Sequence, residues 1–274
     1  MTTTAQVREH LRGWAMPHVL CPGCAHGIVG RAFLSAVDDV GIDPDQMAVV
    51  AGIGCSSRLV GYLDFCTLHA THGRAPSFAA GIKLARPELT VAVFSGDGDG
   101  LAIGGNHLIH AARRNIDLTV VLFNNEIYGM TGGQAAPTTS VGAIASTAPR
   151  GSVESPFDAC KLMIGAGATF VARAAASEPY TLARIFADAL DHEGLSFVEV
   201  LSDCPTYFGR YNKLGSGPEM LAAITRSDNR IAIPLAGKRS IPTIDPPDLP
   251  PGVELGTLHR EHRPVFTGRA GGAT

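Results

Sequence analysis

The sequence is poor in charged and aromatic residues and contains no long apolar run. Of its 274 residues, 17% are charged and 6% are aromatic, and the formal net charge is −3. Because the lysines and arginines are scattered, we expect no binding to nucleic acid or to an anionic membrane surface. No stretch approaches the roughly 18 apolar residues of a membrane-spanning helix. The N-terminal segment MTTTAQVREHLRGW is charged where a signal peptide is apolar, so a cytoplasmic protein is predicted.

Cysteine is infrequent, and a reducing compartment disfavours disulfides. We therefore expect the cysteines to be thiols or metal ligands rather than a disulfide framework. The six are Cys21, Cys24, Cys55, Cys66, Cys160 and Cys204.

Apolar runs alternate with segments of helical periodicity along most of the chain. Continuous β-branched runs separated by helices are typical of a parallel sheet with helices on both faces. The predicted fold class is therefore α/β with a mostly parallel sheet. Strands are expected over 47–52, 89–95, 117–125, 168–173 and 195–202, and helices over 25–39, 76–86, 105–114 and 181–190, with a further helix after a polar loop at 131–153.

The periodic pattern ends near residue 209. Segment 232–256 holds six prolines and no apolar period, so it cannot build a core of its own. We expect one α/β domain over 1–231 and an irregular, proline-rich C-terminal extension over 232–274, which either lacks order or lies along a partner.

Residues 91–105, VAVFSGDGDGLAIGG, form an apolar run that ends in glycines. Glycines after a strand let backbone N–H groups approach a phosphate, yet Asp97 and Asp99 would repel that anion. A divalent cation such as Mg²⁺ removes the conflict, because it takes oxygen ligands and bridges protein carboxylates to substrate phosphates.

The next predicted strand ends in a second set of oxygen ligands. It runs into LFNNEIYGMTGGQ, where Asn124 and Asn125 follow the apolar residues. Ligands of open α/β sheets bind at the carboxyl ends of the strands, so these side chains and Asp97 can face one crevice.

Together the two stretches resemble the GDG…NN motif of thiamine diphosphate enzymes. The resemblance implies a thiamine diphosphate-binding fold and a Mg²⁺ ion held by Asp97, Asn125 and the backbone carbonyl of Ile127. The alternative is a polar turn after each strand, with the two asparagines capping the following segment. For Asp99, a cap on the following helix is preferred over a contact around the metal.

Four cysteines lie in motifs that suggest a second metal centre. CPGCAHG contains a C-x₂-C pair, while GIGCSSR follows the first predicted strand and SDCPTY the last. A C-x₂-C pair can be half of a zinc site, a redox pair or two ligands of an iron–sulfur cluster. The thiamine motif favours the cluster, because an electron acceptor beside that cofactor would make a decarboxylation oxidative.

With THGRA also present and all motifs in order, residues 15–215 resemble the β subunits of 2-oxoacid:ferredoxin oxidoreductases. The resemblance implies a 4Fe–4S cluster on Cys21, Cys24, Cys55 and Cys204, with zinc as the alternative. Cys66 and Cys160 have no counterpart in these motifs and are expected to be small buried side chains.

The resemblance further implies contacts with cofactor and substrate. The catalytic candidates are Ser56, His72 and Arg74. The cofactor-binding candidates are Gly54, Ser56, His72, Gly96, Asp97, Gly98, Asp99, Asn125, Ile127, Gly129, Met130 and Thr131. Further candidates are Gly73, Gly104, Gly105, Gly132 and Gln134, and for the loop 128–134 the alternative is a flexible connection.

The implied reaction is the reversible oxidative decarboxylation of a 2-oxoacid to acyl-CoA and CO₂, with electrons passing through the cluster to ferredoxin. Within the family, Gly132 in MTGGQ points to 2-oxoglutarate, with pyruvate and branched-chain 2-oxoacids left open. One α/β domain can hold only the diphosphate end of the cofactor, so an α subunit is expected, in an αβ or (αβ)₂ assembly. The alternatives are a thiamine-dependent, non-oxidative decarboxylase subunit and a non-catalytic iron–sulfur electron-transfer module.

Overall fold

The computed structural model describes residues 3–224, 230–231 and 253–267. A seven-stranded sheet with the order β11-β7-β8-β4-β3-β1-β2 forms its centre. All neighbouring strands in this sheet are parallel except β11, which runs antiparallel to β7, so the predicted fold class is confirmed. The strands are β1 (Met47–Ala51), β2 (Cys66–His69), β3 (Thr90–Gly96), β4 (Leu118–Asn124), β7 (Phe170–Ala175), β8 (Leu195–Leu201) and β11 (Gly256–Arg260), with the short pairs β5 (Ile127–Tyr128) and β6 (Gln134–Ala135), and β9 (Arg230–Ile231) and β10 (Val253–Glu254), outside the sheet.

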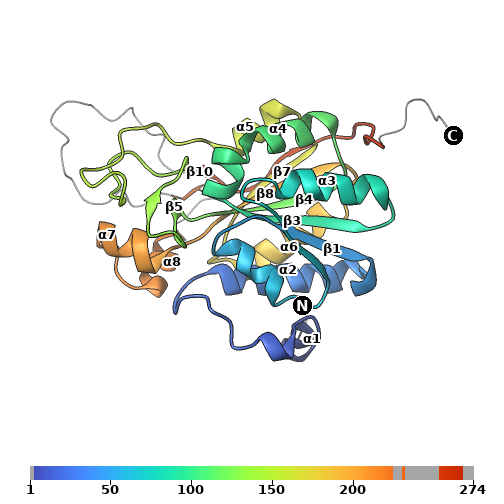
Figure 1. Cartoon of the computed structure of the whole chain (residues 1–274), viewed down its shortest axis with the longest axis horizontal. Coiled ribbons are helices and arrows are strands. Elements are labelled where there is room, and N and C mark those ends of the chain that lie inside the picture. Colours follow the sequence, from blue (N-terminus) through green and yellow to red (C-terminus); the bar gives the residue numbers. More distant parts are fainter. Residues whose placement is uncertain (1–2, 225–229, 232–252, 268–274) are drawn as a thin grey trace.

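Helices cover both faces of the sheet (Figure 1). One face carries α2 (His26–Val40) and α6 (Pro179–Leu190), which pack against each other, and the other carries α3 (Ala75–Ala85), α4 (Gly105–Arg114) and α5 (Ala159–Ala166). The shorter helices are α1 (Thr4–Glu9), α7 (Arg210–Asn212), α8 (Gly217–Ile224), the 3₁₀-helices η1 (Gly13–Ala15), η2 (Pro44–Gln46) and η3 (Ser56–Gly61), and the π-helices η4 (Gly98–Ile103) and η5 (Pro205–Gly209).

Phenylalanine rings join α2 and α6 to the sheet. The ring of Phe33 on α2 lies edge-on to Phe94 on β3 at 4.9 Å and to Phe186 on α6 at 5.7 Å, and Phe94 in turn contacts Phe123 on β4. All four side chains are almost completely buried. Buried aromatic pairs of this geometry add to the hydrophobic free energy of burial, and here they fix β3 and β4 side by side.

The ends of β3 and β4 are aligned across the sheet. Gly96, the last residue of β3, pairs with Phe123 on β4. The polar residues that follow each strand, Asp97 and Asn125, therefore emerge at the same edge, as the sequence predicts for parallel neighbours.

Two sequence-based expectations need correction. The structure places α8 and β11 after residue 209, where no regular element was expected, and β11 extends the main sheet. Its residues are half-exposed at a sheet edge, so they lack the apolar period by which a buried strand is recognised. Cys66 is exposed rather than buried because it lies on β2, the opposite edge strand, whereas Cys160 is fully buried as expected.

The C-terminal segment is fastened to the domain beyond β11. Arg263 donates to the carbonyls of Ala112 and Gly167, and the Asn115 side chain donates to the carbonyls of Arg263 and Pro264. Most of the proline-rich segment, 232–252, and residues 268–274 lie outside the described residues, so the boundary at 231 stays a prediction.

Within the described ranges, no helix is both long and apolar enough to span a membrane.

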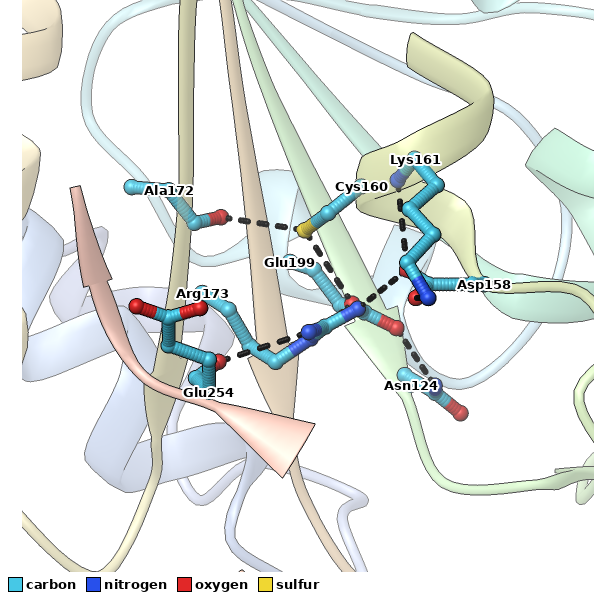
Figure 2. A network of polar contacts seen from close by, with 8 residues as sticks. All are labelled: Asn124, Asp158, Cys160, Lys161, Ala172, Arg173, Glu199 and Glu254. Atoms are coloured by element: carbon cyan, nitrogen blue, oxygen red, sulfur yellow. Dashed lines mark hydrogen bonds and ion pairs between the residues drawn. The ribbon is translucent and has the colours of Figure 1, made fainter. Parts of the chain in front are cut away.

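A buried ion pair links β7 and β8 (Figure 2). Arg173 and Glu199 pair in the sheet register, and Arg173 Nε donates to Glu199 Oε2 at 2.6 Å, with the two side chains 6% and 3% exposed. A second guanidinium nitrogen donates to Asp158 Oδ1 at 2.6 Å. Burial opposes the charge of Arg173, but Glu199 and Asp158 outweigh it and hold the pKa of Arg173 above its ordinary value.

We predict that Arg173→Leu destabilises the fold by about 3–5 kcal/mol, because Glu199 would remain buried without its counter-charge. Urea denaturation followed by circular dichroism measures the loss. The matched control is Arg86→Leu, which removes an ion pair with the exposed Glu88 and should change stability little. Equal losses in the two variants would contradict the prediction.

Candidate active site

A cavity of about 520 Å³ lies at the carboxyl ends of β1, β3 and β4. Its walls come from the loops that follow these three strands and from the loop before α3. The structure thus brings together most of the predicted site residues: Gly54, Ser56, His72, Gly96, Asp97, Gly98, Asp99, Asn125, Ile127, Gly129, Met130, Thr131 and Gln134 all line the cavity.

Other candidates lie outside this wall. Arg74, Gly73, Gly104, Gly105 and Gly132 are not among its lining residues, and the Arg74 guanidinium donates to the His72 carbonyl at 2.8 Å. Sequence reasoning did not single out four residues that do line it, namely His26, Ile53, Phe123 and Tyr128. All four fall inside motifs that the sequence analysis quotes, His26 in CPGCAHG, Ile53 in GIGCSSR, and Phe123 and Tyr128 in LFNNEIYGMTGGQ, so those motifs contained the signal.

Asp97 is buried at the base of the cavity, with 2% of its surface exposed. Its Oδ1 accepts from the Gly98 N–H at 2.8 Å, and its Oδ2 accepts from the Thr138 hydroxyl at 2.7 Å. Burial outweighs these hydrogen bonds and raises the pKa of Asp97 to about 6. The carboxylate therefore lies where a bound cation would favour its charged form.

Asp99 is not a helix cap, contrary to the preferred sequence-based interpretation. Its Oδ1 accepts from the N–H groups of Ile53 and Gly73, and its Oδ2 accepts from the Ser95 hydroxyl at 2.6 Å. The reason is that η4 begins at Gly98, so Asp97 takes the capping position, and the side chain of Asp99, the second residue of η4, faces the neighbouring loops. One buried carboxylate thus joins β3 to the loops after β1 and before α3.

Asp99 also orients His72. The Nδ1 atom of His72 lies 2.7 Å from Asp99 Oδ1. Because the carboxylate accepts, Nδ1 carries the proton, which leaves Nε2 of this cavity-lining ring available to a ligand.

Glycine is required at two close contacts with residues of the cavity wall. A Cβ at Gly52 would lie 2.1 Å from Asp99 Oδ2, and a Cβ at Gly98 would lie 2.4 Å from the Tyr128 ring. The Tyr128 hydroxyl donates to the Gly98 carbonyl at 2.9 Å, so the loop after β4 closes directly over the loop after β3.

The two asparagines form consecutive turns at the end of β4. Asn124 Oδ1 accepts from the Glu126 N–H at 3.2 Å, and Asn125 Oδ1 accepts from the Ile127 N–H at 3.3 Å. Glu126 itself adopts a left-handed conformation with φ 61°. The turn places both Asn125 and Ile127 on the cavity wall.

All four motif cysteines line a second cavity of about 70 Å³: Cys21, Cys24, Cys55 and Cys204. A Cβ at Gly129 would lie 3.4 Å from the sulfur of Cys55 and 3.5 Å from that of Cys204, so these two thiols face the same glycine. Burial raises the pKa of Cys24 to about 12 and that of Cys55 to about 11. Without a cation these thiols are protonated at neutral pH.

The described residues contain no group of three or more His, Cys, Asp or Glu side chains already arranged to hold a metal ion. The two cavities are nevertheless adjacent, because they share the lining residues His26, Cys55, Asn125, Gly129 and Met130.

Known proteins similar to this chain include thiamine diphosphate-binding enzymes. Residues 51–200 match the family model described as "Thiamine pyrophosphate enzyme, C-terminal TPP binding domain". The 2-oxoglutarate synthase subunit KorB of Methanothermobacter thermautotrophicus is 53% identical over 213 residues, which are 78% of this chain and 74% of that protein. The 2-oxoacid:ferredoxin oxidoreductase subunit beta of Saccharolobus solfataricus is 43% identical over 68% of this chain and 62% of that protein.

The chain belongs to the β subunits of 2-oxoacid:ferredoxin oxidoreductases. A solved structure of the 2-oxoglutarate:ferredoxin oxidoreductase from Magnetococcus marinus, with 2-oxoglutarate, coenzyme A and succinyl-CoA bound, has a TM-score of 0.79 and 31% identity to it, and the match covers 96% of this chain and 87% of that one. The family predicted from the motifs, its thiamine diphosphate-binding fold and its enzymatic activity are confirmed.

We predict that Asp99→Ala destabilises this β subunit by at least about 3 kcal/mol, because two backbone N–H groups and a serine hydroxyl lose their acceptor. Urea denaturation measures the effect, and isothermal titration with thiamine diphosphate should show weakened binding. Asp45→Ala, at an exposed position, is the control. Unchanged stability of the Asp99 variant would show that the carboxylate does not hold the three segments together.

Proposed function

We propose that this chain binds thiamine diphosphate, Mg²⁺ and a 4Fe–4S cluster in an enzyme that converts 2-oxoglutarate and coenzyme A to the acyl-CoA and CO₂. Two electrons pass one at a time to ferredoxin. The observation that carries this proposal is the shared wall between the large cavity and the four-cysteine cavity. A cofactor in the first cavity and a cluster in the second would be neighbours.

The residues at the base of the large cavity fit a magnesium ion. Asp97 offers a carboxylate, Asn125 a carboxamide oxygen and Ile127 a backbone carbonyl, and all three residues line the cavity. Mg²⁺ prefers oxygen ligands and is commonly bound by one or two carboxylates together with substrate phosphates. Its charge would offset the burial of Asp97 and the repulsion between that carboxylate and a diphosphate.

Thiamine diphosphate would supply the nucleophilic carbon and the electron sink for decarboxylation. The chain's own residues bind and orient the reacting groups. His72, oriented by Asp99, offers Nε2 to the cavity and can move a proton at the substrate. Ser56 lines the same wall, whereas Arg74, which donates to the His72 carbonyl, acts by holding the histidine loop.

The four cysteines are better explained as ligands of an iron–sulfur cluster than as free thiols. Cluster iron is held by thiolates, and iron would supply the positive charge that these buried thiols need in order to ionise. When bound, the cluster would accept single electrons from the neighbouring cavity.

Two observations favour 2-oxoglutarate as the substrate. Relatives at 53% identity are named 2-oxoglutarate synthase subunits. Gly132, which within the family points to 2-oxoglutarate, has a φ of 115°, a backbone conformation that L side chains rarely adopt. Pyruvate and branched-chain 2-oxoacids are the alternatives.

The cavity is incomplete in this chain alone. No glutamate that could activate the aminopyrimidine is among the described residues lining it, and the apolar side chains of Ile53 and Met130 are 44% and 46% exposed at its wall. An α subunit that supplies the carboxylate would cover these side chains, and the relatives are named as subunits of larger enzymes. A cytoplasmic location and an αβ or (αβ)₂ assembly go with this proposal.

We predict that Asp97→Ala or Asn125→Ala abolishes Mg²⁺-dependent binding of thiamine diphosphate, because the diphosphate would lose the cation that neutralises it. Isothermal titration with and without Mg²⁺ measures the loss. Iron content should be unchanged in both variants. Cofactor affinity equal to wild type in both would refute the assigned magnesium ligands.

Anaerobically purified protein should contain about four irons per chain, as a cubane on four thiolates requires. Cys204→Ala should lose the iron, while Cys66→Ala and Cys160→Ala should retain it. Metal analysis and the visible spectrum provide the measurement. A colourless protein with one zinc per chain would favour the zinc alternative.

The chain alone should not catalyse the reaction even after reconstitution with iron, Mg²⁺ and thiamine diphosphate. The assay is CoA-dependent reduction of a viologen dye with 2-oxoglutarate, pyruvate or 2-oxoisovalerate. Activity should appear on addition of the α subunit and be highest with 2-oxoglutarate. Turnover by the isolated chain would contradict the two-subunit arrangement, and a preference for another 2-oxoacid would overturn the substrate assignment alone.

A further inference from the structure

The buried ion pair between β7 and β8 reaches the active site through a hydrogen bond to the end of β4 (Figure 2). Glu199 Oε2 accepts from Arg173 Nε at 2.6 Å, and Glu199 Oε1 accepts from Asn124 Nδ2 at 2.7 Å. Asn124 directly precedes the proposed magnesium ligand Asn125. Its side chain therefore joins the interior of the sheet to the loop that lines the cavity.

Glu199 determines which way the Asn124 carboxamide points. Both carboxylate oxygens of Glu199 act as acceptors, one from Arg173 and one from Asn124, so Asn124 must turn its NH₂ group toward Glu199. Its oxygen then faces the other way and accepts from the Glu126 N–H at 3.2 Å. A carboxamide rotated by half a turn would place a donor against that N–H.

The Glu126 N–H belongs to the strained part of the turn. Glu126 has φ 61°, a conformation that non-glycine residues adopt only when their surroundings hold them there. Three further contacts assist: the Thr139 hydroxyl donates to its carbonyl, and the N–H and hydroxyl of Ser140 donate to its carboxylate. The residues on either side of this turn are Asn125 and Ile127, both on the cavity wall.

We propose that Arg173, Glu199 and Asn124 form a positioning relay: the ion pair fixes the Asn124 carboxamide, which fixes the turn at Glu126 that presents Asn125 and Ile127 to the Mg²⁺-diphosphate. This inference rests on the proposed function of that site. None of the three relay residues is among the residues that line the large cavity. Their effect is on the geometry of two metal ligands.

The relay can be reversed by exchanging its donor and acceptor. In Glu199→Gln, the new carboxamide must keep its oxygen toward Arg173, so its NH₂ group faces that of Asn124, and Asn124 has to rotate away from the Glu126 N–H. In Asn124→Asp, two carboxylates face each other. In the double variant Asn124→Asp with Glu199→Gln, the introduced glutamine donates to the introduced aspartate, whose second oxygen again accepts from the Glu126 N–H. The net charge of the double variant equals that of the wild type.

The test uses the complex of this chain and its partner subunit. Isothermal titration of thiamine diphosphate into that complex, at several Mg²⁺ concentrations, gives the dissociation constant of the cofactor. Each single variant should raise this constant at least tenfold at limiting Mg²⁺, and the double variant should return it to within threefold of wild type. Cys160→Ala is the matched control, because the thiol lies 3.3 Å from Glu199 Oε2 but has no contact with Asn124 in the network, and it should bind like wild type.

Thermal unfolding and iron content are measured on every variant to confirm that each is folded. Wild-type affinity in Glu199→Gln, or a double variant weaker than both single variants, would overturn the relay. If Glu199→Gln is recovered only unfolded, Asn124→Asp tests the link from its other end, and wild-type affinity there would overturn it as well. If instead Asp97→Ala keeps Mg²⁺-dependent binding, the assigned metal site fails, which is a different result from failure of the relay alone.

Discussion

The arrangement of the site depends on a carboxylate that is buried where an anion must bind. Asp97 is 2% exposed, and burial raises its pKa to about 6 even though it accepts two hydrogen bonds. Burying such a group costs desolvation free energy, which a cation that shares its site would offset. The oxygens of Asn125 and Ile127, brought to the same wall by the alignment of β3 and β4, are what a Mg²⁺ ion would require.

Buried hydrogen-bond networks support the residues around Asp97 from two sides. Asp99 fastens the loops after β1 and before α3 to β3, and it also fixes the tautomer of His72. On the far side, the Arg173–Glu199 pair reaches Asn124 at the end of β4. Buried charges of this kind cost desolvation free energy, and their use here is to hold side chains in one orientation.

Much of this could be predicted from the sequence, because the informative residues lie in short motifs at strand ends. The five strands with continuous apolar runs were predicted, and most of the residues expected to contact the cofactor line the large cavity, whereas Gly73, Gly104, Gly105 and Gly132 do not. The edge strands β2 and β11 were missed, since half-exposed residues carry no clear period. Thr138, Asp99 and Glu199 act through contacts with residues far away in the chain, and no local pattern encodes such contacts.

Electrons released in the cavity beside Asp97 are expected to pass to a cluster on the four cysteines. The most direct measurement is electron paramagnetic resonance of the anaerobic two-subunit complex, loaded with thiamine diphosphate and Mg²⁺ and mixed with 2-oxoglutarate and coenzyme A in the absence of ferredoxin. This electron transfer predicts the signal of a reduced 4Fe–4S cluster in wild type and no such signal in an Asp97→Ala complex that retains its iron. Release of CO₂ with the cluster remaining oxidised in the wild-type complex would contradict it.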